Sequence, residues 1–460
     1  MKTRGRILVA ACLFTLAGNL SCFAQVLVYP NGQRVPGELA GPLSGSSIAL
    51  VAGPESAWIN PAGLAADPGK AATAGADLFR YSTTTVDGRA ESRFESVPAF
   101  AAFSWGGGAK RGESGWGTAI ALDWPESTRH GTAVHSADLL SFGEVPTRID
   151  PGGLDVFEDG VFTRRTTQGL GEYRVLSTVF AAGYGFSDGF RLGFGLEWQR
   201  VDYLAQSSSL RTYHAETKED PQQTYRAHIL SESRFDGQVD RVVPILGIQA
   251  RPMAGFLFGV HARLPSRFAG GKGSARWSQS SSATLDSGAN PADTTTELLA
   301  AEQAGQKFDL RSPLEVGLGF GFAGSSSSFE FDVSRSFGLP RYTVLDVPES
   351  EPPSTSVYRP PAFRTGSVPA THWRTGFTLA VSGNTAWMLG IRDDSPEVPP
   401  DDPVFRQFGL STVSTAWAVQ RGNASLSCCF LYECSSPQHA SNHPPRHQIR
   451  HQDASALQAT

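Results

Sequence analysis

The chain has 460 residues, which is long enough for two or three soluble domains or for one large barrel. Its net charge of -5 and pI near 6.1 show no basic excess, so we expect no nucleic acid partner. Charged residues make up 18% of the chain, and 49 glycines and 28 phenylalanines stand beside 3 methionines. This composition favours β-strands with one apolar face over long helices.

Residues 1–24 predict a secretory signal peptide, with a basic start, an apolar core and small residues before Gln25. Val9–Cys12 resembles a lipoprotein box, but the apolar run before it is short, so cleavage after Ala24 is favoured. No later stretch has the roughly 20 uninterrupted apolar residues that a membrane helix needs. We therefore expect an exported chain without helical membrane spans.

Residues 25–71 precede the first strand-like run, and we interpret them as a plug that folds back. The centre of this plug is Ser56–Ala65. Pro61 pushes Asn60 out of the helical region, and Gly63 is expected to allow a left-handed bend. Taken alone, this turn could instead end a helix or begin a strand.

Residues 72–432 contain runs in which apolar and polar residues alternate, and Phe190–Trp198 is the best instance. The side chains of one face are large and apolar, whereas the other face carries charges and glycines. Each run has about the 9–11 residues that a tilted membrane strand requires. Lipid outside and water inside would explain both faces, which favours an antiparallel transmembrane β-barrel.

Thirteen strands are predicted in this region, joined by connections that alternate in length. The strands are placed near 72–87, 95–106, 115–124, 171–187, 189–203, 239–252, 255–266, 311–323, 326–338, 370–382, 384–393, 407–420 and 423–432. The long connections are placed at 125–170, 204–238, 267–310, 339–369 and 394–406, with a shorter one at 88–94. Tight periplasmic turns and long external loops are typical of outer-membrane barrels.

The end of the chain departs from this pattern. Bacterial single-chain barrels nearly always have an even number of strands, so a fourteenth strand should follow Tyr432. Residues 433–460 instead carry prolines and histidines without apolar alternation, and we expect an anomalous, disordered tail that does not pair with the first strand. We favour an altered end, and expect a neighbouring reading frame from about Ser427 to restore a strand ending in an aromatic residue.

No catalytic constellation is found, and we predict neither an enzyme nor a cofactor or metal site. Gly270–Ser274 resembles a phosphate loop but lacks the earlier glycine and a hydroxyl residue after the lysine, so an external loop is favoured. Histidines recur every four residues in the tail and could bind a metal ion from one face of a helix: His439, His443, His447 and His451. Pro444 and Pro445 would interrupt any helix there, so no metal site is predicted. Asp393, Asp394, Asp401 and Asp402 could hold a divalent cation, although a solvated loop is favoured. Pro244 marks either a strand start or a bend, gate or lateral opening.

Three stretches together resemble the long-chain fatty acid transporters of the outer membrane, the FadL/TodX type. Ser56–Leu64, with Asn60, Pro61, Ala62 and Gly63, is similar to the hatch segment of this family. Gly247–Phe268 is similar to a mid-chain hairpin, and Leu389–Pro399 is similar to the end of a late strand. The order and spacing of the three are more specific than any one of them.

The resemblance implies a fourteen-stranded barrel, an N-terminal hatch and passive, porin-like uptake of long-chain fatty acids or other hydrophobic small molecules. The barrel would lie among the lipids of the outer membrane of a Gram-negative-type bacterium, as a monomer. Two alternatives stay open. One is a structural or adhesive outer-membrane barrel that binds a partner through its long external loops, and the other is an exported soluble β-protein.

Overall fold

The computed structural model describes residues 47–66, 69–86, 89–108, 114–140, 161–187, 189–216, 224–286, 293–345, 363–395, 409–421 and 424–436. The signal peptide, residues 25–46 of the expected plug, residues 437–460 of the expected tail, and Asp401 and Asp402 lie outside these ranges. Within them the fold is all-β, apart from the short helix α2 (Ser56–Ile59) and the 3-10 helix η1 (Pro61–Ala65). No described helix is long and apolar enough to cross a membrane.

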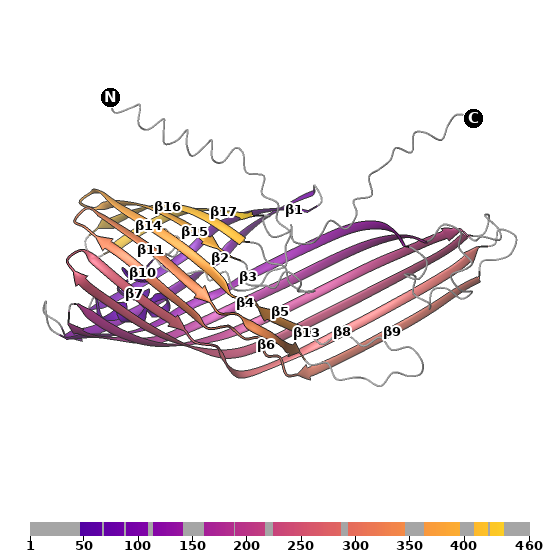
Figure 1. The fold of residues 1–460 in the computed structure, drawn as a ribbon, viewed down its shortest axis with the longest axis horizontal. Coiled ribbons are helices and arrows are strands. Elements are labelled where there is room, and N and C mark those ends of the chain that lie inside the picture. The colour runs from indigo at the N-terminus through magenta and orange to yellow at the C-terminus, as the bar shows by residue number, and fades with distance from the viewer. Residues whose placement is uncertain are drawn as a thin grey trace, which may run out of the picture.

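One antiparallel sheet makes up most of the described chain (Figure 1). Its strands are β1 (Lys70–Val86), β2 (Arg89–Gly108), β3 (Gly115–Leu140), β4 (Val161–Ser187), β5 (Phe190–Glu216), β6 (Thr224–Met253), β7 (Phe256–Arg263), β8 (Arg267–Asp286), β9 (Asp293–Gln306), β10 (Glu315–Ala323), β11 (Ser327–Ser336), β14 (Ala370–Ser382), β15 (Thr385–Asp394), β16 (Gly409–Arg421) and β17 (Ala424–Ser436). A separate two-stranded sheet joins β12 (Leu339–Leu345) and β13 (Phe363–Ser367).

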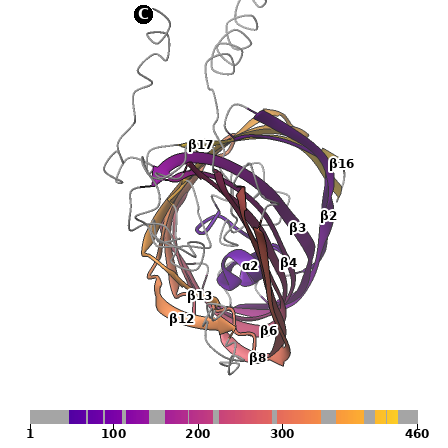
Figure 2. The ribbon, with the colours of Figure 1, turned by 90° about the vertical axis from the view of Figure 1, so that its right-hand side faces the viewer.

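The sheet curls around α2, which lies within the ring of strands in Figure 2. Its path runs from β1 to β7, then through β10, β11 and β14 to β17, so thirteen strands follow one another as neighbours. These correspond to the thirteen predicted strands, in the predicted order. Among the described residues β17 pairs with β16 and β1 pairs with β2, with no ladder between β1 and β17. The described barrel is therefore open.

The two faces of the sheet differ in the way that the alternation predicts. On β5, Leu192, Phe194 and Leu196 are exposed, whereas Glu197 and Gln199 on the opposite face are buried. The same holds on β10, where Phe320 is exposed. Apolar side chains cover the outer face because a strand sends successive side chains to opposite sides. The polar and glycine residues line the inside.

The long connections predicted by sequence are wrong in most cases, because strands extend into them. Residues 125–140, 161–170 and 204–216 continue β3, β4 and β5, and β8 and β9 occupy most of 267–310, including Gly270–Ser274. The expected loop at 88–94 belongs almost entirely to β2, and β12 and β13 lie within 339–369. The sequences of the extensions are rich in polar residues, so they lack the apolar alternation by which the other strands were recognised.

At the C-terminal end, Glu433–Ser436 also belongs to a strand. These residues continue β17 and pair with β16, for example Thr412 with Glu433. The expected boundary after Tyr432 is therefore four residues too early. The residues after Ser436 lie outside the described part of the chain.

Candidate functional site

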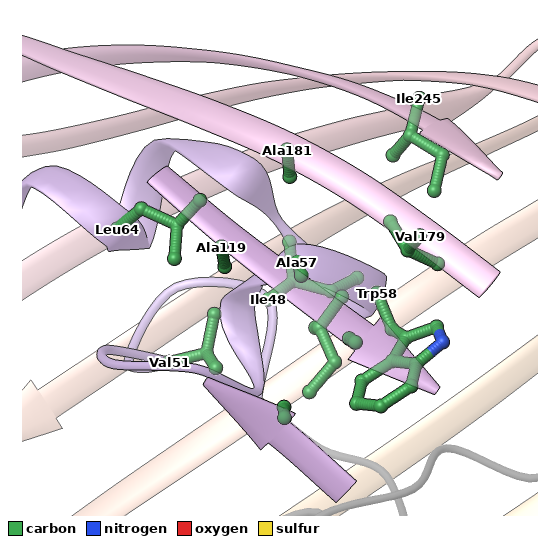
Figure 3. Packing of buried hydrophobic residues seen from close by; sticks show 12 residues of the cluster. Ile48, Val51, Ala57, Trp58, Leu64, Ala119, Val179, Ala181 and Ile245 are labelled. Atoms are coloured by element: carbon green, nitrogen blue, oxygen red, sulfur yellow. The ribbon is translucent and has the colours of Figure 1, made fainter. Parts of the chain in front are cut away.

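Residues 47–66, called here the inner segment, fill the space inside the curled sheet. Almost every residue from Ser47 to Ala65 is buried, including Trp58 and Leu64. Figure 3 shows its side chains packed with those of the wall: Ile48, Val51, Ala57, Trp58 and Leu64 meet Ala119, Val179, Ala181 and Ile245. The ring of Trp58 also meets Phe100 edge to face, with centroids 6.1 Å apart. Apolar burial therefore holds the segment inside the sheet.

Asn60 fixes the turn between the two helices. Its backbone is extended (φ -153°, ψ 98°), as the following proline requires, and its side-chain oxygen accepts from the Ala62 N–H at 3.3 Å. Its side-chain amide donates to the carbonyls of Ile48 at 2.8 Å and Ile248 at 3.0 Å. Because Ile248 belongs to β6, this one side chain ties the inner segment both to itself and to the wall. Pro61 occupies the first helical position, where its missing N–H costs nothing.

The left-handed bend expected at Gly63 is wrong. Gly63 lies within the right-handed turn of η1, and it is absent from the glycines with positive φ. A β-carbon at Gly63 would instead collide with the Val51 carbonyl and the Ser56 hydroxyl. Glycine is needed here for a close approach rather than for its conformational freedom.

The wall receives the inner segment through a ring of glycines. They include Gly117 on β3, Gly183 on β4, Gly193 on β5, Gly247 on β6, Gly259 on β7 and Gly319 on β10. A β-carbon at any of them would lie under 3.0 Å from an atom of the inner segment, a distance that real β-carbons essentially never show. The sequence analysis assigned such glycines to a water-facing surface. They are instead where the backbone of the inner segment lies directly against the wall.

Two carboxylates on β11 hold the start of the inner segment. Asp332 accepts from the backbone N–H groups of Ser47 at 2.7 Å and Ile48 at 3.2 Å. Glu330 accepts from those of Ala49 at 2.5 Å and Leu50 at 3.3 Å. Both carboxylates are 1% exposed, so water does not compete for these bonds. The carboxylates satisfy four consecutive backbone donors that a short turn cannot satisfy itself.

Further polar ties join the inner segment to β6 and β7. Gln249 donates to the Val51 carbonyl at 2.9 Å. Arg263 donates to the Trp58 carbonyl at 3.5 Å and pairs with Glu197 on β5. The sequence analysis singled out none of these residues, nor the carboxylates of β11. In the sequence, the only feature that could have marked these residues is a charged or amide side chain at an inward position of an alternating strand.

Pro244 lies inside β6 rather than at a strand start, so the strand-start interpretation is wrong. It pairs with Leu196 of β5 in unbroken register, and its carbonyl accepts from the Leu264 N–H at 2.9 Å. The N–H and C=O of one residue point to the same side of an extended strand, so its missing donor faces away from β5. On that side the neighbour of β6 changes from β8, at Val242, to β7, at Ile245. The proline therefore sits where the ladder is already interrupted.

The remaining metal-site candidates from sequence either bind other side chains or lie outside the described chain. Asp394 is bound by His372 at 3.3 Å and by Arg392 at 2.7 Å, whereas Asp393 pairs with Ser411 at 2.8 Å. The four tail histidines are outside the described residues. Across the described ranges, no group of three or more His, Cys, Asp or Glu side chains is placed to hold a metal ion.

The fold and site together define an all-β antiparallel sheet curled around an N-terminal inner segment. No protein-family model matches the chain, and no curated protein matches it significantly. Solved structures that are similar include a Pseudomonas aeruginosa FadL homologue (11% identity, 86% of this chain and 88% of the other, TM-score 0.47). The CymD monoaromatic hydrocarbon channel (11%, 86% and 92%, 0.43) and the Ralstonia pickettii toluene transporter TbuX (12%, 87% and 98%, 0.38) are also similar. Likenesses this distant assign no function.

Replacing Asn60 by alanine should loosen the inner segment. The variant loses three hydrogen bonds and leaves the Ile48 carbonyl with only the 3.5 Å bond from Gln249, which should cost about 1–3 kcal/mol. Asn60→Asp keeps the oxygen that caps η1 but loses both amide donors, so it separates the two roles. The measurement is protease sensitivity of residues 47–66 in detergent. Asn384→Ala, in the exposed turn after β14, is the control. If Asn60→Ala and Asn384→Ala were equally sensitive to protease, Asn60 would not hold the inner segment.

Proposed function

We propose that the chain is an outer-membrane β-barrel channel for passive uptake of long-chain fatty acids or other hydrophobic compounds. In this proposal the plug lies within residues 25–69, the barrel wall runs from β1 to β17 (70–436), and residues 1–24 are the export signal. The turn at Asn60, Pro61, Ala62 and Gly63 fixes the plug in place. The protein acts as a monomer, without cofactor or metal.

The observation that carries this proposal is the combination of an apolar outer face with a filled interior. Phe180, Phe194, Phe320 and Trp417, on four different strands, are all 43–56% exposed on the outer face. Such a surface is unfavourable in water and suits hydrocarbon. The inner segment occupies the lumen by close backbone contact with six glycines, which supports a plug rather than an accidental insertion.

The catalytic alternative finds no support in the described site. The inward side chains are engaged in holding the inner segment, as Asn60, Glu330 and Asp332 illustrate. Diffusion of an apolar solute requires shape and apolar surface rather than proton transfer. We therefore propose transport and not an enzymatic reaction.

Uptake of a labelled long-chain fatty acid tests the function. We expect the protein to restore oleate uptake in a bacterium whose own outer-membrane fatty acid channel has been deleted. Toluene is the second probe, because the proposal covers hydrophobic compounds in general. Failure to take up either compound, in cells whose outer membrane contains the folded protein, would contradict the proposal.

Deleting Ser56–Ala65 should open the lumen to small polar solutes. This deletion removes α2 and η1, which contact β3, β4, β5 and β6, and leaves the wall strands intact. In liposomes we expect the variant to leak a pentose such as arabinose several-fold faster than the intact protein. An unchanged leak would remove the plug from the proposal.

Pro244 is the position that we propose for gating. Pro244→Ala should change the free energy of unfolding by no more than about 0.5 kcal/mol, because the added N–H points into the interrupted ladder between β7 and β8. If the interruption lets the wall move, oleate uptake should fall although stability is unchanged. Uptake equal to that of the unmodified protein would exclude this role.

A second candidate function rests on the length of the strands. Strands β4, β5 and β6 have 27, 27 and 30 residues, whereas a tilted membrane strand needs about 9–11. The excess length supports a sheet that projects beyond the membrane, as an adhesive barrel would need. Shortening the β5–β6 hairpin separates the two functions. Lost adhesion to a surface with intact oleate uptake would favour the second.

A further inference from the structure

A second group of residues meets on the inner face of the sheet, far along the chain from the first. Residues 307–312, between β9 and β10, contact β12: Phe308 and Leu345 form an isolated β-bridge, and the Asp309 N–H donates to the Val344 carbonyl at 2.9 Å. We call residues 307–312 and β12 together the second insert. Its strand β12 begins just after Gly338, whose positive φ of 72° turns the chain out of β11.

The second insert is packed as tightly as the inner segment. Phe308 and Leu345 are completely buried, and the Phe308 ring stacks on Tyr203 of β5 with centroids 6.0 Å apart. Glycines again make the contact possible: a β-carbon at Gly237 of β6 would collide with the Phe308 ring, and one at Gly273 of β8 would press on Leu345. The second insert therefore has a built seat of its own on the wall.

The second insert and the inner segment lie on the same face of the wall at different heights. On β6 the inner segment contacts Gly247 and the second insert contacts Gly237, both at inward positions of one strand. Ten residues of strand separate these contacts, which corresponds to about 33 Å. A solute that travels along this face would therefore pass the two in succession.

A chain of polar side chains joins the two. Arg241 donates to the Leu310 carbonyl of the second insert at 3.1 Å and to Gln199 at 2.7 Å. Gln199 donates to Glu197 at 2.7 Å, and Glu197 pairs with Arg263, which reaches the Trp58 carbonyl of the inner segment. The wall between the apolar contacts of the inner segment and those of the second insert is thus polar, and its side chains are hydrogen-bonded to one another.

The outer edge of the second insert is also fixed. Arg311 pairs with Asp309 at 2.8 Å, and its backbone N–H donates to the Tyr342 hydroxyl at 2.8 Å. Burial raises the pKa of Tyr342 to about 12, even further above physiological pH than the ordinary tyrosine value. Residues 307–312 and β12 are therefore both held in place, and their contacts with the wall do not involve the inner segment.

We propose that the second insert is a second constriction of the lumen, in series with the plug, and that the buried Phe308 ring anchors this constriction on the wall and so maintains its size limit. This inference rests on the proposed channel function. Removing the plug alone would then leave a pore that admits small sugars and excludes larger ones.

The test compares the swelling of liposomes in arabinose, sucrose and raffinose, with the Ser56–Ala65 deletion as the common background. Adding Phe308→Ala should raise the rate for raffinose relative to arabinose several-fold. Gly237→Ala should do the same without removing any core side chain, because its methyl group displaces the Phe308 ring. Phe308→Leu keeps apolar bulk and should retain most of the limit. Phe180→Ala, on the exposed outer face, is the control and should change nothing.

The outcomes separate this inference from the proposed function. The second constriction would be overturned, and the plug would stand, if the Ser56–Ala65 deletion alone admitted raffinose as fast as the deletion combined with Phe308→Ala or Gly237→Ala. No leak from any variant would overturn both. If the deletion leaks only after Phe308→Ala is added, the second constriction is supported as the barrier, and the plug is removed from the proposal. A heat-modifiability gel on each preparation checks that the variants are folded.

Discussion

Gly193→Ala should push the inner segment away from the wall and destabilise the protein by about 1–3 kcal/mol, the usual cost of forcing extra atoms into a packed interior. A β-carbon at Gly193 would meet the backbone at Pro61 and Ala62, which cannot rotate aside as a side chain can. The strand itself gives no reason for the effect, because alanine fits an ordinary β-strand. The measurements are the temperature at which the folded band is lost on a gel and the protease sensitivity of residues 47–66.

Gly195→Ala is the matched control for this variant. Gly195 is two residues away on the same face of β5, and its β-carbon would lie 3.5 Å from those of Ala181 and Ile245, an ordinary contact. We expect Gly195→Ala to leave both measurements unchanged or to stabilise the strand slightly. Equal effects of the two substitutions would mean that the inner segment does not lie against β5.

Replacing Glu330 and Asp332 together by alanine should release the start of the inner segment. The double variant leaves the backbone N–H groups of residues 47–50 inside the sheet without acceptors, and each buried donor left unpaired costs about 1–3 kcal/mol. Hydrogen exchange at these four amides should accelerate by about a hundredfold or more. Asp240→Ala removes a partly exposed ion pair with Arg200 and should leave their exchange unchanged.

The conservative double variant Glu330→Gln and Asp332→Asn refines this expectation. Each amide side chain keeps one oxygen that can accept the backbone N–H groups but puts an NH2 group in place of the second oxygen. We expect exchange at residues 47–50 to fall between that of the unmodified protein and that of the alanine variant. Exchange in the alanine variant no faster than in the unmodified protein would show that β11 does not hold the segment.

The wall of this protein could be predicted from sequence because one physical pattern defines it. The thirteen strands of the main path were found through the alternation that Phe190–Trp198 illustrates, and all of them are present in order. The strands β8 and β9 were missed because neither presents an apolar face. The hairpin β12–β13 was missed because it is short and follows the turn at Gly338.

The interior was less accessible to sequence analysis. The extended backbone of Asn60 followed from the local effect of Pro61, but the wall partner of its side chain, the Ile248 carbonyl, lies on a strand 188 residues away. The role of Gly63 was misjudged because a glycine in sequence does not reveal whether it serves conformation or close approach. The same ambiguity concealed the ring of glycines, and nothing local distinguished Glu330 and Asp332 from other polar inward residues.

Membrane fractionation followed by a heat-modifiability gel tests the central claim, that this chain is an outer-membrane barrel whose lumen is filled by its own N-terminal plug. The account predicts a protein that stays with the outer-membrane fraction, needs detergent for extraction and migrates faster unheated than boiled. It further predicts that Gly193→Ala, but not Gly195→Ala, lowers the temperature of that shift. Recovery of the mature chain in the soluble fraction without detergent, with no difference between heated and unheated samples, would contradict it.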